Sequence, residues 1–268
     1  MAKAYIGVDG VARKIKKSYI GVDGIARKIK KVYIGDENGV AKEYYSSGKK
    51  LSEYTVGSSV YLNENGSPVE YLIVHQGLPD STLYDSSCDG VWLLKKTVSD
   101  VHQWDSTNND YINSDIHSYL NNEYLTLFDV SVKSIIKQVK IPYVNGTGSN
   151  AVSYGEQGLE TRIFLLSGYE LGWTNANSSK FPVDGAKLDY FISGTTASAN
   201  SKRIAYQNNT QRLWWLRSAV TNNTSMAWYV DTDGTFETGT TGSNYRIRPA
   251  LILPYTALVD EETNILIG

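Results

Sequence analysis

The sequence predicts an α+β fold, and three observations support this prediction. Short apolar runs of strand length, such as 69–75, 91–94 and 247–253, lie between loops rich in Gly, Asn and Ser. The segment that begins at Ser114 has instead the spacing of an amphipathic helix. Strands and helices also do not alternate as βαβ units require. We therefore expect helices beside sheets whose strands have irregular connections.

The composition is that of a folded chain. It has 268 residues, of which 41% are hydrophobic, with 20 Tyr and 6 Trp, enough for a sizeable core and too aromatic for a disordered chain. A formal net charge of −2 disfavours nucleic acid as a general partner. The single cysteine, Cys88, excludes an intramolecular disulfide, and without basic neighbours we expect a buried or inert thiol. No run reaches transmembrane length and the chain starts without an apolar signal, so we expect neither a membrane span nor a signal peptide.

The N-terminal part consists of repeats with a period of 14 residues. Residues 5–17 and 19–31 differ at one position, and residues 33–45 form a degenerate third copy. Each copy holds an Asp-Gly or Asn-Gly pair, which is typical of a type I′ hairpin turn. A turn at Asp9-Gly10 pairs Val8 with Val11, and the third copy would turn at Asn38-Gly39. The repeats therefore predict one β-hairpin per copy.

We expect residues 1–46 to be an attachment or oligomerisation module. Residues 1–32 hold nine Lys or Arg against two Asp, which leaves 17 basic and 26 acidic residues in the remainder. Isolated hairpins are only marginally stable in water, so these should pack on one another, on other copies of the chain or on a larger body. A basic, solvated tail is the alternative interpretation.

Residues 47–268 form the second predicted domain. Ser114 is a good helix N-cap, and one face of the following helix would be apolar. The turn between the first two strands would be Asn65-Gly66. The expected elements are, in order, strands at 60–62, 69–75 and 91–94, a helix from 114 to about 127, an amphipathic element at 132–139, a strand at 163–166, a short helix at 188–192, and strands at 213–216 and 247–253.

A hairpin is predicted between the last two strands. A three-residue turn, 232–234, places Gly234 in the left-handed conformation and sets Val230 opposite Phe236. The inward residues would then be Trp228, Val230 and Phe236, and the outward residues Ala227, Tyr229, Asp231 and Glu237. The adjacent Trp214 and Trp215 are expected to pack in the core.

No motif predicts catalysis or a cofactor. The three histidines are isolated in sequence, without the spacing of metal ligands. Residues 146–151 match a loose G-x-G-x-x-A pattern but lead into no helix that could bind a pyrophosphate. Asp231 to Gly234 resembles the start of a calcium loop, yet Gly242 stands where that loop needs Glu. We expect no catalytic residue, no metal and no cofactor.

The segment between the last two strands is typical of a binding surface, because small polar residues surround a few large aromatic ones. Its motifs also carry a family resemblance. Residues 214–218 (WWLRS), 229–234 and 246–251 (RIRPAL) resemble the C-terminal signature of an uncharacterised bacterial and phage domain family. That family is similar to C-type lectin-fold proteins, including the formylglycine-generating-enzyme type and the variable proteins of diversity-generating retroelements. The resemblance covers roughly residues 50–255, and residues 1–46 resemble segments of prophage tail or fibre proteins.

The resemblance implies a C-type lectin-like fold for residues 47–268 and a site between its two strongest motifs. In the variable proteins, the exposed residues of this segment bind the target. The implied ligand-binding set here is Asn222, Asn223, Thr224, Ser225, Met226, Trp228, Tyr229, Asp231, Glu237, Thr238, Thr240, Asn244 and Tyr245. Trp228 is the one member that the predicted hairpin turns inward.

The implied function is that of a phage- or prophage-encoded receptor-binding protein. It would adhere to a bacterial surface protein or glycan, contact virion or tail proteins through residues 1–46, and form a homo-oligomer. Its location would be the virion, after assembly in the bacterial cytoplasm. The alternatives are an enzyme of the formylglycine-generating type that acts on a glycan or peptide, and a purely structural virion component. The enzymatic relatives use a cysteine pair or a metal-ligand set, neither of which this sequence has.

Overall fold

A computed structural model gives the structure of the chain, and its described residues form a mainly β fold. These are residues 5–8, 11–14, 18–22, 25–29, 31–35, 41–46, 48–174 and 181–267. For the residues up to Ser46, only the backbone strands are described. Strands account for 36% and helices for 16% of the structure. The predicted α+β, C-type lectin-like class is therefore wrong. Its helical evidence came from short segments, of which the longest helix has eight residues.

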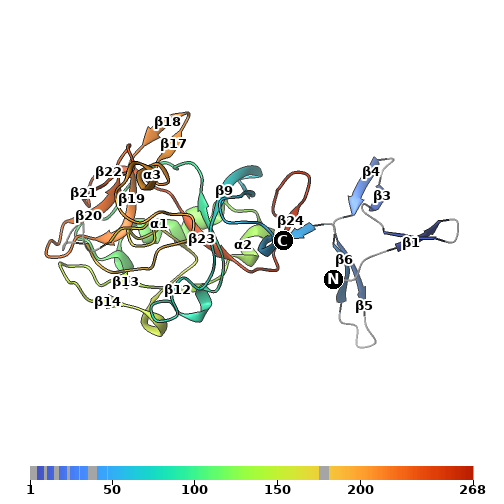
Figure 1. Ribbon diagram of the computed structural model, residues 1–268, viewed down its shortest axis with the longest axis horizontal. Coiled ribbons are helices and arrows are strands. Elements are labelled where there is room, and N and C mark those ends of the chain that lie inside the picture. Colours follow the sequence, from blue (N-terminus) through green and yellow to red (C-terminus); the bar gives the residue numbers. More distant parts are fainter. Residues whose placement is uncertain are drawn as a thin grey trace.

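Two five-stranded sheets form the main body (Figure 1). The first has an antiparallel core whose strand β10 is buried along its whole length. Its order is β16 (Ile163–Phe164), β23 (Ala250–Leu253), β10 (Gly90–Lys95), β9 (Ser67–Gly77) and β8 (Ser59–Glu64). The second has the order β11 (Val101–Gln103), β22 (Asn244–Arg246), β19 (Trp214–Ala219), β20 (Met226–Val230) and β21 (Phe236–Thr240).

Smaller elements surround these sheets. The helices are α1 (Asp115–Asn122), α2 (Val130–Ile135) and α3 (Ala197–Ser201), with 3-10 turns η1 (Leu51–Glu53), η2 (Ser86–Cys88), η3 (Tyr111–Asn113), η4 (Tyr124–Leu127) and η5 (Gly155–Gln157). Two-stranded pairs are β12 (Val139–Ile141) with β15 (Leu159–Thr161), β13 (Tyr143–Val144) with β14 (Val152–Ser153), β17 (Ala205–Gln207) with β18 (Thr210–Arg212), and β7 (Gly48–Lys50) with β24 (Leu258–Asp260). No helix among the described residues is long and apolar enough to cross a membrane.

The N-terminal repeats form three hairpins in the described residues. They are β1 (Tyr5–Val8) with β2 (Val11–Lys14), β3 (Ser18–Val22) with β4 (Ile25–Ile29), and β5 (Lys31–Gly35) with β6 (Ala41–Ser46). The predicted pairing of Val8 with Val11 is confirmed. The proposed turn at Asn38-Gly39 lies outside the described residues. Figure 1 places these hairpins beyond the end of the body where β7 pairs with β24. Their role as an attachment module stays a prediction.

Several local predictions are confirmed. Asn65 and Gly66 both have positive φ, as the type I′ turn between β8 and β9 requires. The Ser114 side chain accepts a hydrogen bond from the His117 backbone amide and caps α1. Cys88 is fully buried, and burial raises the pKa of its thiol to about 12, so the thiolate is not formed at neutral pH.

Other predictions are wrong. The element predicted over 132–139 ends as a helix at Ile135, and Val139 begins strand β12 instead. The strand predicted over 163–166 keeps only Ile163 and Phe164 as β16. Residues 188–192 form no helix, although Leu188 and Phe191 are buried. In these segments apolar spacing marked most of the buried residues, although Ile192 is exposed, while long-range contacts determined the backbone.

A buried arginine joins β19 to the irregular segments beside it. Arg217 forms a bidentate ion pair with Glu170, with nitrogen–oxygen distances of 2.6 and 2.7 Å. Its remaining donors bind the backbone carbonyls of Pro142, Leu165 and Asp184. All five guanidinium N–H groups are thus satisfied. Because both charged side chains are completely buried, the pair is stable only as a complete network.

We predict that Arg217→Ala destabilises the fold by about 3–5 kcal/mol, because Glu170 would be left as an uncompensated buried charge. Urea unfolding measures this effect. The control is Arg212→Ala, since Arg212 is exposed on β18 and its loss should change stability by less than about 0.5 kcal/mol. An Arg217→Ala variant with the wild-type unfolding midpoint would contradict the assigned role.

A second prediction concerns Asp184, which is completely buried and accepts a hydrogen bond from the Ser218 hydroxyl at 2.8 Å. Burial raises the pKa of its carboxyl to about 7, although Arg217 opposes this shift. The folded state therefore holds a proton that the unfolded state releases near its ordinary pKa of about 4. Stability from this group is complete below that value and is lost as pH rises toward 7, by at most about 1.4 kcal/mol per pH unit.

Asp184→Asn removes the titrating group. As pH rises from about 4 to about 7, the free energy of unfolding of the wild type should fall relative to that of this variant. Urea unfolding across this range measures the difference. Asp233→Asn is the control, because hydrogen bonds from Thr235 lower the pKa of Asp233 and give it a pH dependence of opposite sign. A difference that does not vary with pH for Asp184→Asn would refute the assignment.

Candidate ligand-binding surface

The most distinctive part of the predicted binding segment is a set of three aromatic rings on one side of the second sheet. Trp215 on β19 stacks against Tyr245 on β22, with ring centroids 4.4 Å apart. Tyr229 on β20 packs edge-on against Tyr245 at 4.9 Å and against Trp215 at 6.0 Å. Trp215 is completely buried, whereas the two tyrosines are half-buried. We call these three residues the aromatic face.

Strand register places these rings together. Trp215 pairs with Tyr229, and Tyr229 pairs with Glu237 on β21. The side chains of Trp215, Tyr229 and Glu237 therefore lie on one side of the sheet. The Trp215 indole nitrogen also donates a hydrogen bond of 3.1 Å to the His102 carbonyl on β11. The aromatic face is therefore built across β11, β22, β19 and β20, which gives it a rigid support.

Gly239 leaves the space that the Tyr245 ring occupies. A Cβ atom at this position would lie 2.7 Å from Tyr245 Cε2 and 3.0 Å from Trp215 Cη2. Both distances are shorter than side-chain carbons normally tolerate. Because Gly239 pairs with Ala227, this part of the sheet carries only small residues beneath the rings. The stacked arrangement thus depends on a glycine within β21.

Carboxylates flank the aromatic face. Burial raises the pKa of the Tyr229 hydroxyl to about 12, and Tyr245, Asp231 and Glu237 add to this shift. The hydroxyl therefore stays protonated at neutral pH and can both donate and accept hydrogen bonds. Glu237 is exposed and Asp231 is half-buried. The surface offers flat aromatic area beside hydroxyl and carboxylate groups.

A second group of predicted residues lies in the loop between β19 and β20, residues 220–225, which we call the Ser225 loop. The buried Asn109 amide nitrogen binds the carbonyls of Val220, Asn223 and Met226 at 3.1, 2.8 and 2.9 Å. Asn222 has a φ of 61°. One completely buried side chain thus determines the shape of this loop. Asn222 and Thr224 are exposed at its tip.

The structure divides the predicted ligand-binding residues between two sides of the hairpin. The predicted register is confirmed, since Val230 pairs with Phe236, Trp228 pairs with Thr238, and Gly234 has a φ of 86°. The side of the aromatic face carries Tyr229, Glu237 and Tyr245, with Asp231 beside the turn. The opposite side carries Met226, Trp228, Thr238 and Thr240. The loop carries Asn222, Asn223, Thr224 and Ser225, and Asn244 is the exposed first residue of strand β22.

Two predictions for individual residues need correction. Trp228 is 7% exposed and packs against Phe181, Trp173 and other rings of the core, so it is a core residue and cannot present its ring to a ligand. Ala227, expected to point outward into solvent, is completely buried because the aromatic rings cover its side of the sheet. Trp214 and Trp215 are buried as predicted.

Sequence reasoning missed three residues that shape the surface. The sequence predicts the burial of Trp215 but not its stacking on Tyr245. Gly239 had no turn signal, and only its place in a strand, where glycine is uncommon, could have indicated a close approach. Asn109 lies in the polar run 105–110, where nothing in the sequence distinguishes it from its neighbours. All three act through contacts between distant segments.

Comparison with known proteins gives one match. A family model described as Domain of unknown function (DUF6273) matches residues 89–255. The chain belongs to the DUF6273 family. The matched region contains all five strands of the second sheet, and with them the aromatic face and the Ser225 loop, but it excludes β8 and β9 of the first sheet. No curated protein and no solved structure matches the chain.

We predict that Gly239→Ala displaces Tyr245 from Trp215, because the added methyl group occupies the place of the tyrosine ring. The expected cost is about 1–3 kcal/mol, with a change in the near-ultraviolet circular dichroism of the stacked rings. Gly242→Ala is the control, since a methyl group added at Gly242 would meet nothing within 4 Å. Equal stability and equal spectra for the two variants would argue against the packing described.

Proposed function

We propose that this chain is a ligand-binding protein and that the aromatic face is its main contact surface. The observation that carries the proposal is the packing of half-buried Tyr245 and Tyr229 against buried Trp215 on a five-stranded sheet, with Tyr245 stacked and Tyr229 edge-on. Tyrosines held in this way offer contact area without much loss of side-chain entropy on binding. Such anchors carry much of the binding energy in many interfaces.

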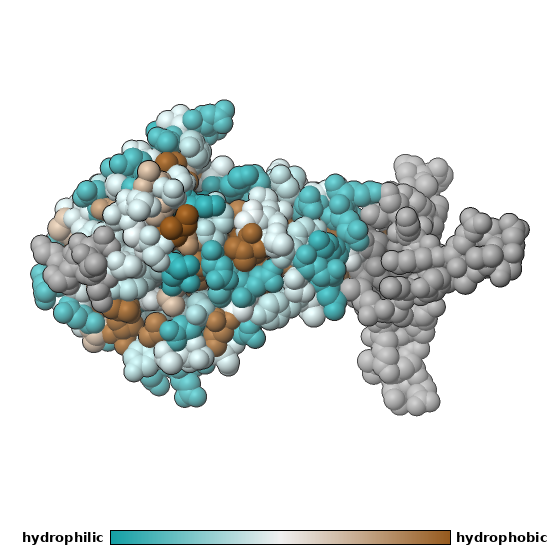
Figure 2. Space-filling model, viewed as in Figure 1, coloured by the Kyte–Doolittle hydropathy of each residue, from teal (hydrophilic) through white to brown (hydrophobic). Residues whose placement is uncertain are grey.

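A bacterial surface glycan is the ligand that this surface fits best. The apolar C–H faces of sugar rings can pack on Tyr229 and Tyr245, while sugar hydroxyls can donate to Glu237 and Asp231. Figure 2 shows apolar residues as small separate patches among hydrophilic ones on the viewed side. A bacterial surface protein is the alternative ligand.

The proposed setting is a phage or prophage particle. Residues 1–46 would attach the protein to virion or tail proteins, and the aromatic face would grip the host cell. The chain order supports this arrangement, because the hairpins β1 to β6 precede the body and the strands β19 to β22 belong to its C-terminal part. An enzymatic role and a purely structural virion role are the competing possibilities.

We predict that the double variant Tyr229→Ala, Tyr245→Ala weakens adhesion by about thirtyfold, which corresponds to about 2 kcal/mol for the loss of central aromatic contacts. The measurements are binding to an array of immobilised bacterial surface polysaccharides and binding of labelled protein to bacterial cells. Tyr154→Ala is the matched control, because Tyr154 is exposed but lies outside the second sheet.

Each outcome has a defined meaning. Polysaccharide binding that is lost in the double variant and kept in the control supports the proposal. Cell binding that survives trypsin treatment of the cells further favours a glycan, whereas its loss favours a surface protein. Unchanged binding in the double variant would show that the aromatic face is not the contact surface. No binding by the wild-type protein to any cell or polysaccharide would favour the structural role.

A further inference from the structure

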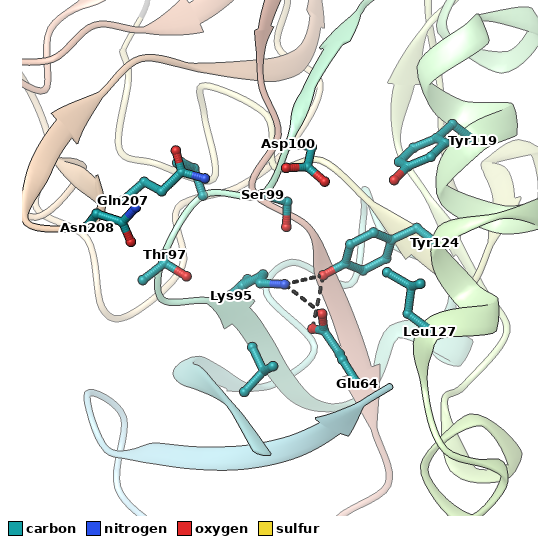
Figure 3. A pocket seen from close by; sticks show the side chains of 12 residues that line it. Glu64, Lys95, Thr97, Ser99, Asp100, Tyr119, Tyr124, Leu127, Gln207 and Asn208 are labelled. Carbon is teal, nitrogen blue, oxygen red and sulfur yellow. Dashed lines mark hydrogen bonds and ion pairs between the residues drawn. The ribbon is translucent and has the colours of Figure 1, made fainter. Parts of the chain in front are cut away.

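A pocket of about 380 Å³ lies apart from the Ser225 loop, between the end of β10, the turn η4 and the hairpin β17–β18 (Figure 3). This volume is in the range of small-molecule sites. Lys95 and Glu64 lie at its base, and Thr97, Gln207 and Asn208 form one wall. Ser99, Asp100 and Tyr119 lie along the other side.

The base of the pocket is a fixed polar network. Lys95 Nζ lies 2.7 Å from Glu64 Oε2 and donates to the Tyr124 hydroxyl at 2.8 Å. The hydroxyls of Tyr124 and Tyr71 donate to Glu64 Oε1 at 3.0 and 2.6 Å. Lys95 and Glu64 are only 8% and 7% exposed. The base is therefore rigid, and it presents polar atoms whose positions do not depend on a ligand.

The polar groups of the pocket favour a neutral ligand that carries several hydroxyl groups. Lys95 is balanced by Glu64, so the exposed carboxylate of Asp100 gives the pocket a net negative charge and disfavours anions. The Ser99 hydroxyl lines the pocket beside the Tyr124 hydroxyl. Carboxylate, hydroxyl and amide groups on several sides suit a polyhydroxylated ring.

A row of rings connects the pocket with the aromatic face. Tyr119 lines the pocket and its ring packs at a tilt against that of His102, with ring centroids 4.4 Å apart. His102 pairs with Tyr245 across β11 and β22, so the two side chains lie on the same side of the sheet. Tyr245 in turn contacts Tyr229. The rings of Tyr119, His102, Tyr245 and Tyr229 thus form a path across the sheet from the pocket.

We infer that the pocket binds the terminal sugar unit of the glycan chain whose following units lie along the aromatic path. The inference rests on the proposed function and adds the recognition of a chain end. Ser99 and Asp100 would bind hydroxyls of the terminal unit, and Tyr119 would pack against its ring. A single sugar should then bind in the pocket by itself, though more weakly than the chain.

The test uses the full chain and free monosaccharides as probes. The probes are N-acetylglucosamine, N-acetylgalactosamine, glucose, galactose and rhamnose, with free amino acids as a comparison set. Saturation-transfer NMR detects binding, and calorimetry measures affinity. Ser99→Ala and Asp100→Asn remove hydrogen-bonding groups, and Thr97→Trp fills the pocket from an exposed position. Glu156→Gln, an exposed carboxylate elsewhere, is the control for Asp100→Asn.

We expect at least one monosaccharide to bind the wild type. Ser99→Ala and Asp100→Asn should weaken it about three- to tenfold, as the loss of one hydrogen bond implies, and Thr97→Trp should abolish it. Glu156→Gln should leave monosaccharide binding unchanged. Circular dichroism checks that each variant is folded, and Thr97→Trp provides an independent result if a substitution at Ser99 disturbs the network.

Three results would overturn the inference: no monosaccharide binds, amino acids bind in place of sugars, or Thr97→Trp binds sugar as the wild type does. Failure here is distinguishable from failure of the proposed function. If polysaccharide binding depends on Tyr229 and Tyr245 but is unchanged in the pocket variants, the aromatic face is supported as the contact surface and the pocket is not a sugar site. If monosaccharides bind in the pocket but the two tyrosine substitutions do not change cell adhesion, the pocket remains a sugar site and the aromatic face is not the contact surface.

Discussion

The buried ion pair of Arg217 with Glu170 is the interaction on which the rest of the second sheet depends. Two charges removed from water are stable only if every donor and acceptor finds a partner, and Arg217 finds all five. Its partners come from segments far apart in the sequence, which are thereby fixed beside β19. Because Trp215 lies two residues before Arg217, the position of the aromatic face follows from the same network.

Only the local part of this architecture could be predicted from the sequence. The turn at Asn65-Gly66, the cap at Ser114 and the register of β20 with β21 depend on a few neighbouring residues, and the structure has all three. The fold class depends on how distant segments pack, and there the prediction was wrong. Leu188 and Phe191 are apolar and buried, yet their segment forms no helix, and Arg203 binds the Ile192 carbonyl within it.

The same distinction applies to the candidate site. The inward direction of Trp228 followed from hairpin geometry, because successive side chains along a strand point to opposite faces of the sheet. The stacking of Tyr245 on Trp215 did not, because β22 lies between β11 and β19 and is not hairpin-paired with either. The pocket was not predicted for the same reason. Its walls come from β10, α1 and β17, and the buried Lys95–Glu64 pair at its base joins residues 31 positions apart.

The pairing of β7 with β24 has a mechanical consequence. Gly48 to Lys50 lie against Leu258 to Asp260, and the next residue, Leu51, is completely buried and hydrogen-bonded to Ala257. If the hairpin segments were pulled while a ligand held the opposite end of the body, the force would run along the strands. It would then act on all the β7–β24 hydrogen bonds at once rather than on one after another. The strand pair would then act as a shear-resistant joint, and a tether at one end could bear force without unfolding the sheet at the other.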